Sequence, residues 1–155
     1  MTVLSKDDLG HWECGFKFNP AKHFGFLYCI HNTIDKRYYI GKKQFFHLGK
    51  KRSKTYGKEM TWRTYCGSSA SLLDDIKKKQ HKNFKFDIID VYNSKGGLYY
   101  AEAFTQMVTE SMTRHNAEGV PWSYNRQIAA IRFVTKEDVT DRTRRYINKI
   151  KRTYK

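Results

Sequence analysis

The chain has 155 residues, about the size of one domain, and 39% of them are hydrophobic and 15% aromatic, which excludes a disordered chain. Lys and Arg total 30 against 15 for Asp and Glu, so the formal charge is +15, which disfavours a small-metabolite enzyme with a neutral surface. The charge predicts a polyanionic partner, with nucleic acid favoured over an anionic membrane. No apolar stretch is long enough to span a membrane, and the N-terminus carries acids where a signal peptide carries bases.

The cysteines predict a reduced protein of the cytoplasm. Cys14, Cys29 and Cys66 are too few and too scattered for a disulfide framework. They form no CxxC pair, and their combinations with His11 match no common zinc-finger spacing. The sequence therefore does not predict a zinc site.

Two strands joined by a tight turn are the first elements predicted. Residues 1–22 are mixed polar and aromatic and are interpreted as an N-terminal arm. Residues 24–30 and 37–41 are rich in the aromatic and branched residues that strands favour, and the segment between them supplies Asn and Asp for a turn. We expect an antiparallel hairpin. His31 and His47 flank it and could contact substrate, but we favour ordinary surface histidines.

A long basic stretch follows the hairpin at residues 42–66. Its cations, which include Lys50 and Lys51, are interleaved with aromatic side chains that can stack on unpaired bases. A loop of this length in a small domain is usually functional or disordered, and its aromatics argue against simple disorder. Contact with nucleic acid and a solvated, flexible basic loop are the two interpretations, and they carry equal weight.

Helices and one more strand complete the predicted domain. A helix is expected over 68–80, a strand over 84–92 and a helix over 98–115. A capping box from Thr135 to Asp138 predicts the start of a C-terminal helix. The order β-β-α-β-α followed by that helix indicates an α+β fold with a small mixed sheet. We expect a domain at 23–130 and a basic helical extension at 131–155.

The C-terminal helix is predicted to carry a basic face. Arg145, Lys149 and Arg152 follow one another at intervals of four and three residues, so they share a face suited to phosphate contacts. An apolar strip on the same segment is expected to dock on the domain. Its members are Val139, Tyr146, Ile147 and Ile150.

Five side chains could carry chemistry, namely Tyr28, Tyr39, Lys42, Glu102 and Asn125. Glu102 falls at the margin of the apolar stripe of its helix, where a half-buried carboxylate can face a cleft and hold a hydrated Mg²⁺. A phenol whose pKa is lowered by nearby cations can accept or relay a proton. Each side chain alone is also compatible with an ordinary structural role, so the prediction depends on their combination.

The order and spacing of these residues resemble those of the GIY-YIG nucleases. The family signature corresponds to Gly25-Phe26-Leu27-Tyr28, ten further residues, and Tyr39-Ile40-Gly41. The similarity runs from about Phe24 to Ile128 and continues through YIGKKQF, TYCGSSASLL, KNFKFDIIDVY, YYAEAF and SYNRQ. This pattern looks most like the phage-type, free-standing, homing-endonuclease-like branch.

The resemblance implies a metal-dependent DNA endonuclease that hydrolyses phosphodiester bonds. It implies that Tyr28 is the general base for the attacking water and that Tyr39 helps to position water or phosphate. It implies one divalent cation, Mg²⁺ or Mn²⁺, on Glu102, with no small-molecule cofactor. Asn125 would support the metal site or the core around it.

The arginine that the family carries on the helix after the YIG motif has no counterpart here, because residues 69–80 contain no Arg. Lys42 is the closest match and the preferred catalytic cation, with Arg63 as the second choice. Arg52 and Lys43 are further candidates for phosphate contact. A lysine delivers a point charge where an arginine offers a bidentate fork.

The alternative function is that of a basic nucleic-acid-binding protein that keeps this scaffold without catalysis. For both functions we expect DNA as the partner, no membrane, and a monomer or weak homodimer. The resemblance implies a phage-encoded protein that acts in the cytoplasm of its host cell. One active site cuts one strand at a time, and the sequence leaves open whether two strands are cut by dimerisation or by sequential nicking.

Overall fold

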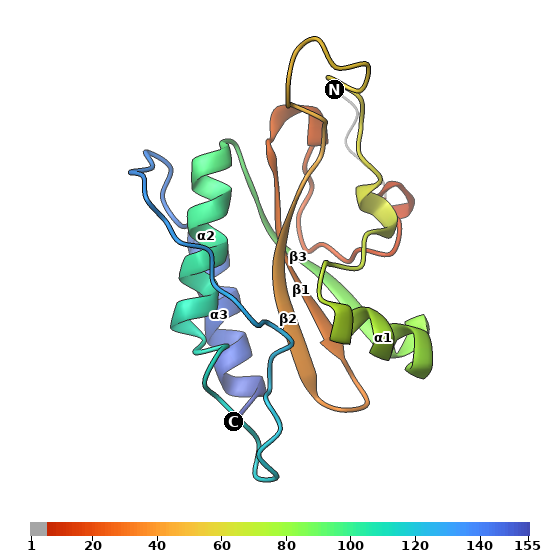
Figure 1. The fold of residues 1–155 in the computed structure, drawn as a ribbon, viewed down its shortest axis with the longest axis vertical. Coiled ribbons are helices and arrows are strands. Elements are labelled where there is room, and N and C mark those ends of the chain that lie inside the picture. The colour runs from red at the N-terminus through yellow and green to blue at the C-terminus, as the bar shows by residue number, and fades with distance from the viewer. Residues whose placement is uncertain (1–5) are drawn as a thin grey trace.

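The computed structural model describes residues 6–155 and has the expected α+β architecture (Figure 1). The strands are β1 (Gly25–Asn32), β2 (Arg37–Gln44) and β3 (Phe84–Tyr92), and the α-helices are α1 (Ala70–Lys79), α2 (Lys95–Val108) and α3 (Asp141–Thr153). Short 3₁₀ segments occur at η1 (Lys6–Leu9), η2 (Pro20–Lys22), η3 (Trp62–Thr64) and η4 (His81–Asn83). The predicted order β-β-α-β-α followed by a C-terminal helix is confirmed.

The sheet has the order β2-β1-β3, so β2 and β3 are its edges. β1 pairs antiparallel with both neighbours. Within residues 6–155, parallel pairing is limited to two isolated bridges, Glu13 with Asp87 and Tyr38 with Ser123. The three strands are therefore antiparallel, and the parallel component of the expected mixed sheet is confined to these bridges.

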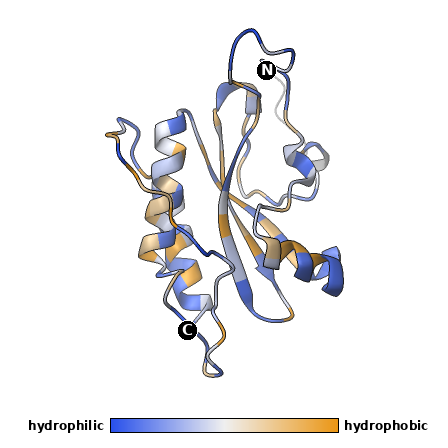
Figure 2. Ribbon diagram, viewed as in Figure 1, coloured by the Kyte–Doolittle hydropathy of each residue, from blue (hydrophilic) through white to orange (hydrophobic). Residues whose placement is uncertain are grey.

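Each face of the sheet is covered by its own core. α2 and α3 lie on one face and α1 on the other (Figure 1). Side chains alternate along β1, so Phe26 and Tyr28 point to the α1 side, while Leu27 and Cys29 point to α2 and α3. The long loop that projects after β2 is largely hydrophilic (Figure 2).

The described residues before β1 belong to the core on the α1 side. Leu9, Trp12 and Phe18 are buried there, and Trp12 Nε1 donates a hydrogen bond to the Trp62 carbonyl at 2.7 Å. The expected division of the chain at residues 22 and 130 stays a prediction, and residues 1–5 of the expected arm lie outside the described residues. The rest of that segment packs against the sheet.

Helix α2 begins and ends earlier than predicted. Its first turn starts at Lys95, because Ser94 Oγ caps it by accepting a hydrogen bond from the Gly97 amide at 3.0 Å. It ends at Val108, and Glu110 then adopts a φ of +54°, which is incompatible with a continued right-handed helix. Gly96 and Gly97, which precede the predicted start at residue 98, thus form part of the first turn of the helix.

Helix α3 begins later than the capping box predicted. Thr135 Oγ1 accepts a hydrogen bond from the Glu137 amide in a turn, and the N-cap is Thr140, whose Oγ1 accepts from the Thr143 amide at 3.1 Å. The apolar strip docks as expected, with Val139, Ile147 and Ile150 buried. In the part of the chain that the structure describes, no helix is both long and apolar enough to cross a bilayer.

His31 lies in a buried polar network that joins α3 to the sheet, so the interpretation as a surface histidine is wrong. Its Nδ1 lies 2.6 Å from Tyr154 Oη and its Nε2 lies 2.7 Å from Tyr146 Oη. Tyr146 in turn donates to Asp87 Oδ2 at 2.5 Å. Burial lowers the pKa of His31, but Cys29 and Asp87 outweigh burial and raise the pKa to about 10. Burial raises the pKa of Asp87, but its bonds with His31 and Tyr146 hold that pKa below 3.8.

This network predicts how stability depends on pH. Because its folded-state pKa is raised, protonated His31 stabilises the fold fully below pH 6.5, and this contribution is lost as the pH rises toward 10. Ionised Asp87 stabilises the fold above pH 3.8, and this contribution is lost as the pH falls through its lower folded-state pKa. Between pH 6.5 and 10, the free energy of unfolding in urea should therefore fall more steeply for wild type than for His31→Asn. Equal slopes would contradict the network.

Candidate functional site

The candidate site lies along the edge of β2. One part of this edge is covered by a later segment of the chain, and the Tyr38 amide donates to the Trp122 carbonyl at 2.8 Å. The Asn125 side chain extends this cover to Ile40, accepting from its amide at 3.0 Å and donating to its carbonyl at 2.8 Å. The cleft begins where this cover ends, beside Lys42.

Gly41 allows the phenol of Tyr28 to reach this edge from the central strand. The two residues are opposite one another in neighbouring strands. A Cβ atom at position 41 would overlap the hydroxyl of Tyr28, so the ring occupies the space that any other residue would fill. The glycine of the YIG motif is therefore required by packing, and it links the two halves of the motif.

Gly41→Ala is expected to displace Tyr28 and to destabilise the fold by about 1–3 kcal/mol, the usual cost of overpacking a filled core. Urea unfolding followed by tryptophan fluorescence measures this change. Gly49→Ala is the matched control, because a Cβ atom there meets no neighbour within 4 Å, and we expect a change of less than about 0.5 kcal/mol. An unfolding midpoint for Gly41→Ala equal to that of wild type would show that the described packing is wrong.

A partly buried ion pair joins β2 to α2. Lys42 Nζ lies 2.5 Å from Glu102 Oε2 and 4.2 Å from the centroid of the Tyr99 ring. The residue Glu102 is 8% exposed, in agreement with its predicted place at the margin of an apolar stripe. Burial raises the pKa of Glu102, and Lys42 opposes this rise. The cleft thus holds one partly desolvated carboxylate with an ammonium beside it.

Two adjoining cavities make up the cleft. The residues that line both are Tyr39, Lys42, Ser68 and Glu102. The first cavity, of about 260 Å³, is also lined by Tyr28, and the second, of about 510 Å³, by Asn125. The structure therefore brings together all five side chains singled out in the sequence. The tyrosines come from the α1 face of the sheet and Glu102 from the α2 face, and they meet at the edge of β2.

The two tyrosines are buried in the cleft. Tyr28 is 1% exposed, and its ring centroid lies 6.2 Å from that of Tyr39, whose hydroxyl lies 3.2 Å from Ser68 Oγ. Burial, with smaller contributions from neighbours that include Tyr39 and Glu102, raises the pKa of Tyr28 well above 10.0. The described residues thus produce the opposite of the lowered pKa expected from the sequence, because desolvation dominates. Tyr28 is a protonated phenol at neutral pH.

Asn125 forms side-chain hydrogen bonds with the backbone of β2 and with Ser123, and none with Tyr28, Tyr39, Lys42 or Glu102. Besides its two bonds with Ile40, its Oδ1 accepts a hydrogen bond from Ser123 Oγ at 2.8 Å. Both ends of the amide are occupied and the residue is buried. These contacts correspond to support of the core around the site, the second of the two roles that the resemblance implied.

The other basic candidates near the hairpin are placed differently from one another. Lys43 lines the first cavity, and its Nζ lies 4.3 Å from the centroid of a neighbouring tyrosine ring. Arg63 donates to the Asp8 carbonyl at 2.6 Å and to Glu59 Oε1 at 2.7 Å, and it lines neither cavity. The exposed loop after β2 carries Lys50, Lys51 and Arg52.

The basic face of α3 lies at the opposite edge of the sheet from the cleft. α3 contacts β3 and α2, and Lys149 Nζ lies 4.0 Å from Asp87 Oδ2. Arg145 and Arg152 are exposed. A groove of about 1130 Å³ at this edge is lined by basic residues that include Lys85, Arg142 and Lys149. The α3 cations and the cleft are therefore separate surfaces.

Sequence reasoning missed three side chains that line the cleft, namely Tyr65, Tyr99 and Arg126. Tyr99 precedes Glu102 by three residues, so helical spacing could have placed both on one face. Arg126 directly follows Asn125 in the chain, and its Nη1 donates to the carbonyls of Ser123 and Asn125 at 3.1 and 3.0 Å. Among residues 6–155, Arg126 is the arginine that lines the cleft, which neither Arg63 nor Arg52 does.

The donor chemistry of Glu102 fits a single hydrated divalent cation. Its Oε2 accepts from Lys42, while Oε1 makes no hydrogen bond to any of residues 6–155. A carboxylate oxygen that faces a cavity is the hard ligand that Mg²⁺ prefers, with water at its remaining positions. No second carboxylate among the described residues lines either cavity, so the protein supplies one charged oxygen ligand.

The α+β fold, with its small antiparallel sheet and three α-helices, is consistent with a GIY-YIG-like domain, and comparison with family models agrees. The model described as "Putative endonuclease segE, GIY-YIG domain" matches residues 12–128, about three quarters of the chain. The chain therefore belongs to the GIY-YIG endonuclease family, as its motifs predicted. No curated protein and no solved structure matches it.

Proposed function

We propose that the protein is a metal-dependent endonuclease that hydrolyses DNA phosphodiester bonds in the cleft at the β2 edge. The observation that carries the proposal is the convergence of Lys42, Glu102 and two buried phenols on adjoining cavities. Membership of an endonuclease family supports the reaction, and the net charge of +15 supports a nucleic-acid substrate.

Glu102 is the proposed ligand of the divalent cation, Mg²⁺ or Mn²⁺, which when bound stabilises negative charge on the phosphoryl oxygens as a Lewis acid. Lys42 supplies a second positive charge, and its ammonium stabilises the charge that develops on the phosphate. This interaction is stronger in a partly desolvated cleft than in water. Lys42 is thereby proposed to stabilise the charge that an arginine stabilises in other members of the family.

Tyr28 and Tyr39 are the groups proposed to act on the attacking water. Tyr28 accepts a proton from this water as the general base, and Tyr39, held at Ser68, positions water or phosphate. Because burial raises the pKa of Tyr28 above 10.0, only a small fraction of this phenol is ionised at neutral pH, and the fraction grows as the pH rises. The general-base role therefore predicts a rate that increases with pH.

Cations around the cleft are proposed to hold the DNA backbone. Lys43 and Arg126 line the cavities, and the basic loop after β2 extends this surface. The α3 face with Arg145, Lys149 and Arg152 lies at the other edge of the sheet, so we assign it to DNA beyond the scissile phosphate. Both surfaces bind through phosphate contacts and would carry no sequence information by themselves.

The salt dependence of DNA binding tests the loop contacts. If six phosphates are contacted, the logarithm of the binding constant should fall with the logarithm of salt concentration with a slope of about −5. The double variant Lys50→Ala with Lys51→Ala should make the slope less negative by about 2, because each of the two lysines neutralises one phosphate. Lys36→Gln, in the turn at the other end of the hairpin, is the control and should leave the slope unchanged. Fluorescence anisotropy over a KCl series measures all three slopes, and no change in the double variant would remove the loop from the interface.

The biological setting follows the resemblance alone. We propose a phage-encoded enzyme that acts in the cytoplasm of its host as a monomer or weak homodimer. Each cleft acts on one strand at a time, so cleavage of both strands would require either dimerisation or sequential nicking.

The direct test of the activity is the nicking of supercoiled plasmid. Purified protein with Mg²⁺ should convert supercoiled plasmid to the open circular form, and EDTA should stop the conversion. DNA binding at the same protein concentration is measured in parallel. Binding without cleavage across plasmid, branched and single-stranded DNA would favour the alternative, a non-catalytic nucleic-acid-binding protein on the same scaffold.

A further inference from the structure

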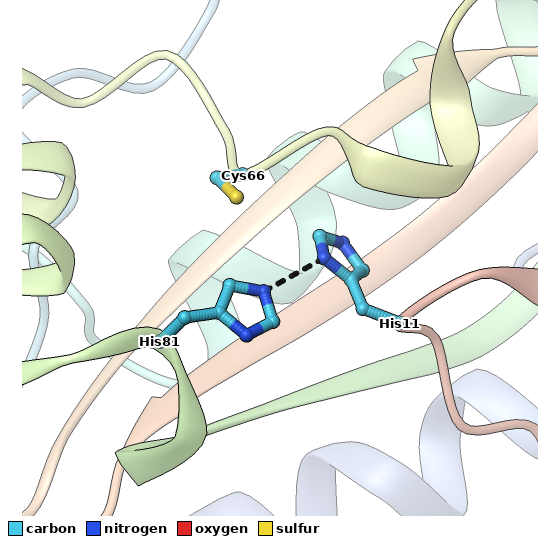
Figure 3. Close-up of side chains that lie close together, drawn as sticks. All are labelled: His11, Cys66 and His81. Carbon is cyan, nitrogen blue, oxygen red and sulfur yellow. Dashed lines mark hydrogen bonds between the residues drawn. The ribbon is translucent and has the colours of Figure 1, made fainter.

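Three side chains that commonly ligate metals converge on the α1 side of the sheet. His11 comes from the segment before β1, Cys66 from the segment between η3 and α1, and His81 from η4. Their donor atoms all lie within 4.8 Å of one another. The two imidazoles face each other, with the Cys66 side chain near both (Figure 3). None of the three residues lines the proposed catalytic cleft.

The hydrogen bonds of His11 fix its tautomer. Its Nε2 lies 2.9 Å from the carbonyl oxygen of Tyr65, which can only accept, so Nε2 carries the proton. The lone pair is then on Nδ1, which points at His81 Nε2 at 3.0 Å. A histidine that donates one ring N–H to a backbone carbonyl and presents the other nitrogen is arranged as metal-ligating histidines usually are.

Aromatic packing holds both imidazoles in place. The ring of Phe86, on β3, stacks on that of His11 with centroids 3.9 Å apart, and on that of His81 with centroids 4.8 Å apart. Phe86 is itself buried in the core, so the two histidines rest on a rigid surface. The two histidine ligands are thus positioned before any ion arrives, which lowers the ordering cost of binding.

We propose that His11, Cys66 and His81 bind a zinc ion, with water at the fourth position. Two imidazole nitrogens and one thiolate sulfur are a donor set that Zn²⁺ favours in tetrahedral geometry, whereas Mg²⁺ prefers oxygen ligands. On binding, the Cys66 thiol releases its proton to solvent, and its sulfur bonds to the metal as thiolate. The proton with which His81 Nε2 donates to His11 Nδ1 moves to His81 Nδ1 through solvent, which frees the Nε2 lone pair for the metal. This site is therefore chemically distinct from the single carboxylate of Glu102.

The zinc ion would cross-link three chain segments, namely the segment before β1, the segment between η3 and α1, and η4. The segment that carries Cys66 also carries Tyr65, whose ring lines the first cavity of the cleft and whose carbonyl is bound by His11. Zinc binding would therefore hold one wall of the cleft in place and raise the melting temperature, because an ion that binds only the folded state stabilises it.

The experiment uses the full chain without a polyhistidine tag, freed of metal with a chelator and titrated with Co²⁺ and then Zn²⁺. We expect one ion per chain, with a thiolate-to-cobalt charge-transfer band and the visible bands of tetrahedral cobalt, both removed by Zn²⁺. Cys66→Ser should lose the charge-transfer band, and His81→Ala, at an exposed position, should weaken binding at least about tenfold. Melting temperature with and without Zn²⁺ is measured for each variant.

Two control variants test whether cobalt binds at this cluster and at no other thiol or carboxylate. Cys14→Ser removes a partly buried thiol outside the cluster and should bind cobalt as wild type does. Glu102→Ala should also keep zinc binding, even if it abolishes cleavage, so a failure of the proposed nuclease mechanism leaves this test intact. No binding by the wild-type chain, or full binding by folded His81→Ala, would overturn the proposal.

Discussion

Glu102→Gln is expected to reduce the Mg²⁺-dependent rate of plasmid nicking by about 10²–10³-fold, the usual loss when one group that stabilises transition-state charge is removed. The substitution keeps the shape of the side chain and removes the charge that Lys42 and the divalent cation both require. Initial rates on supercoiled plasmid measure the effect. Glu110→Gln, at an exposed position after α2, removes the same charge outside the cleft and should cleave as wild type does.

Two further readouts belong to this prediction. DNA binding by Glu102→Gln should stay within a few-fold of wild type, because phosphate contacts come from the basic residues. The raised pKa of Glu102 also means that the metal-free carboxylate is protonated at a higher pH than an ordinary glutamate, so acidification should weaken binding of the divalent cation and slow cleavage. Cleavage by Glu102→Gln at the wild-type rate would exclude the proposed role of this residue.

Tyr28→Phe is the second change with a large expected effect, a loss of about 10²–10⁴-fold in the nicking rate, as is typical for removal of a general base. The ring and its packing against Gly41 are kept, so stability should change little. Because the ionised fraction of this phenol rises with pH, the wild-type rate should rise through the neutral range, while the residual rate of the variant should be independent of pH.

Tyr38→Phe is the matched control for this prediction. Tyr38 is also buried and also has a raised pKa, yet it points to the α2 side of the sheet and lines neither cavity. We expect its nicking rate and pH profile to equal those of wild type. A Tyr28→Phe variant that keeps the wild-type pH profile would assign the general base to another group.

The parts of the fold set by local patterns could be predicted from the sequence. The bounds of β3 agree at both ends, and the hairpin turn forms as expected, with Asn32 Oδ1 accepting from the amides of Ile34 and Asp35. The helix bounds agree less well because caps compete. Ser94 is the N-cap of α2, and Thr140, in place of Thr135, is the N-cap of α3. Which residue caps each helix depends on how that helix docks on the sheet.

Motif spacing predicted which side chains form the cleft, but it did not predict how the fold brings them together. Tyr28 and Glu102 come from opposite faces of the sheet, and no periodicity indicates that they meet around the edge of β2. The space that Gly41 leaves for the phenol is a property of strand register, which a single sequence does not specify. Arg126 was not predicted as a site residue, because it reaches the cleft only through the hydrogen bonds by which the neighbouring Asn125 holds its segment against the edge of β2.

The polar clusters away from the cleft were the least predictable. His31 was interpreted as a surface residue because its partners, Tyr146 in α3 and Tyr154 directly after it, lie more than a hundred residues later in the chain. His11 and His81 lie seventy residues apart and meet on the ring of Phe86. Such clusters are made by tertiary contacts between distant segments, which short spacing rules for metal sites do not describe.

A double-mutant cycle between Tyr28 and Glu102 tests the central claim most directly, because it asks whether the two side chains work in one site. Nicking rates are measured for wild type, Tyr28→Phe, Glu102→Gln and the double variant at one pH and Mg²⁺ concentration. Residues that act as a unit are strongly non-additive, so the double variant should cleave about as slowly as the slower single variant. A double variant whose loss equals the product of the two single losses would contradict a shared site at the edge of β2.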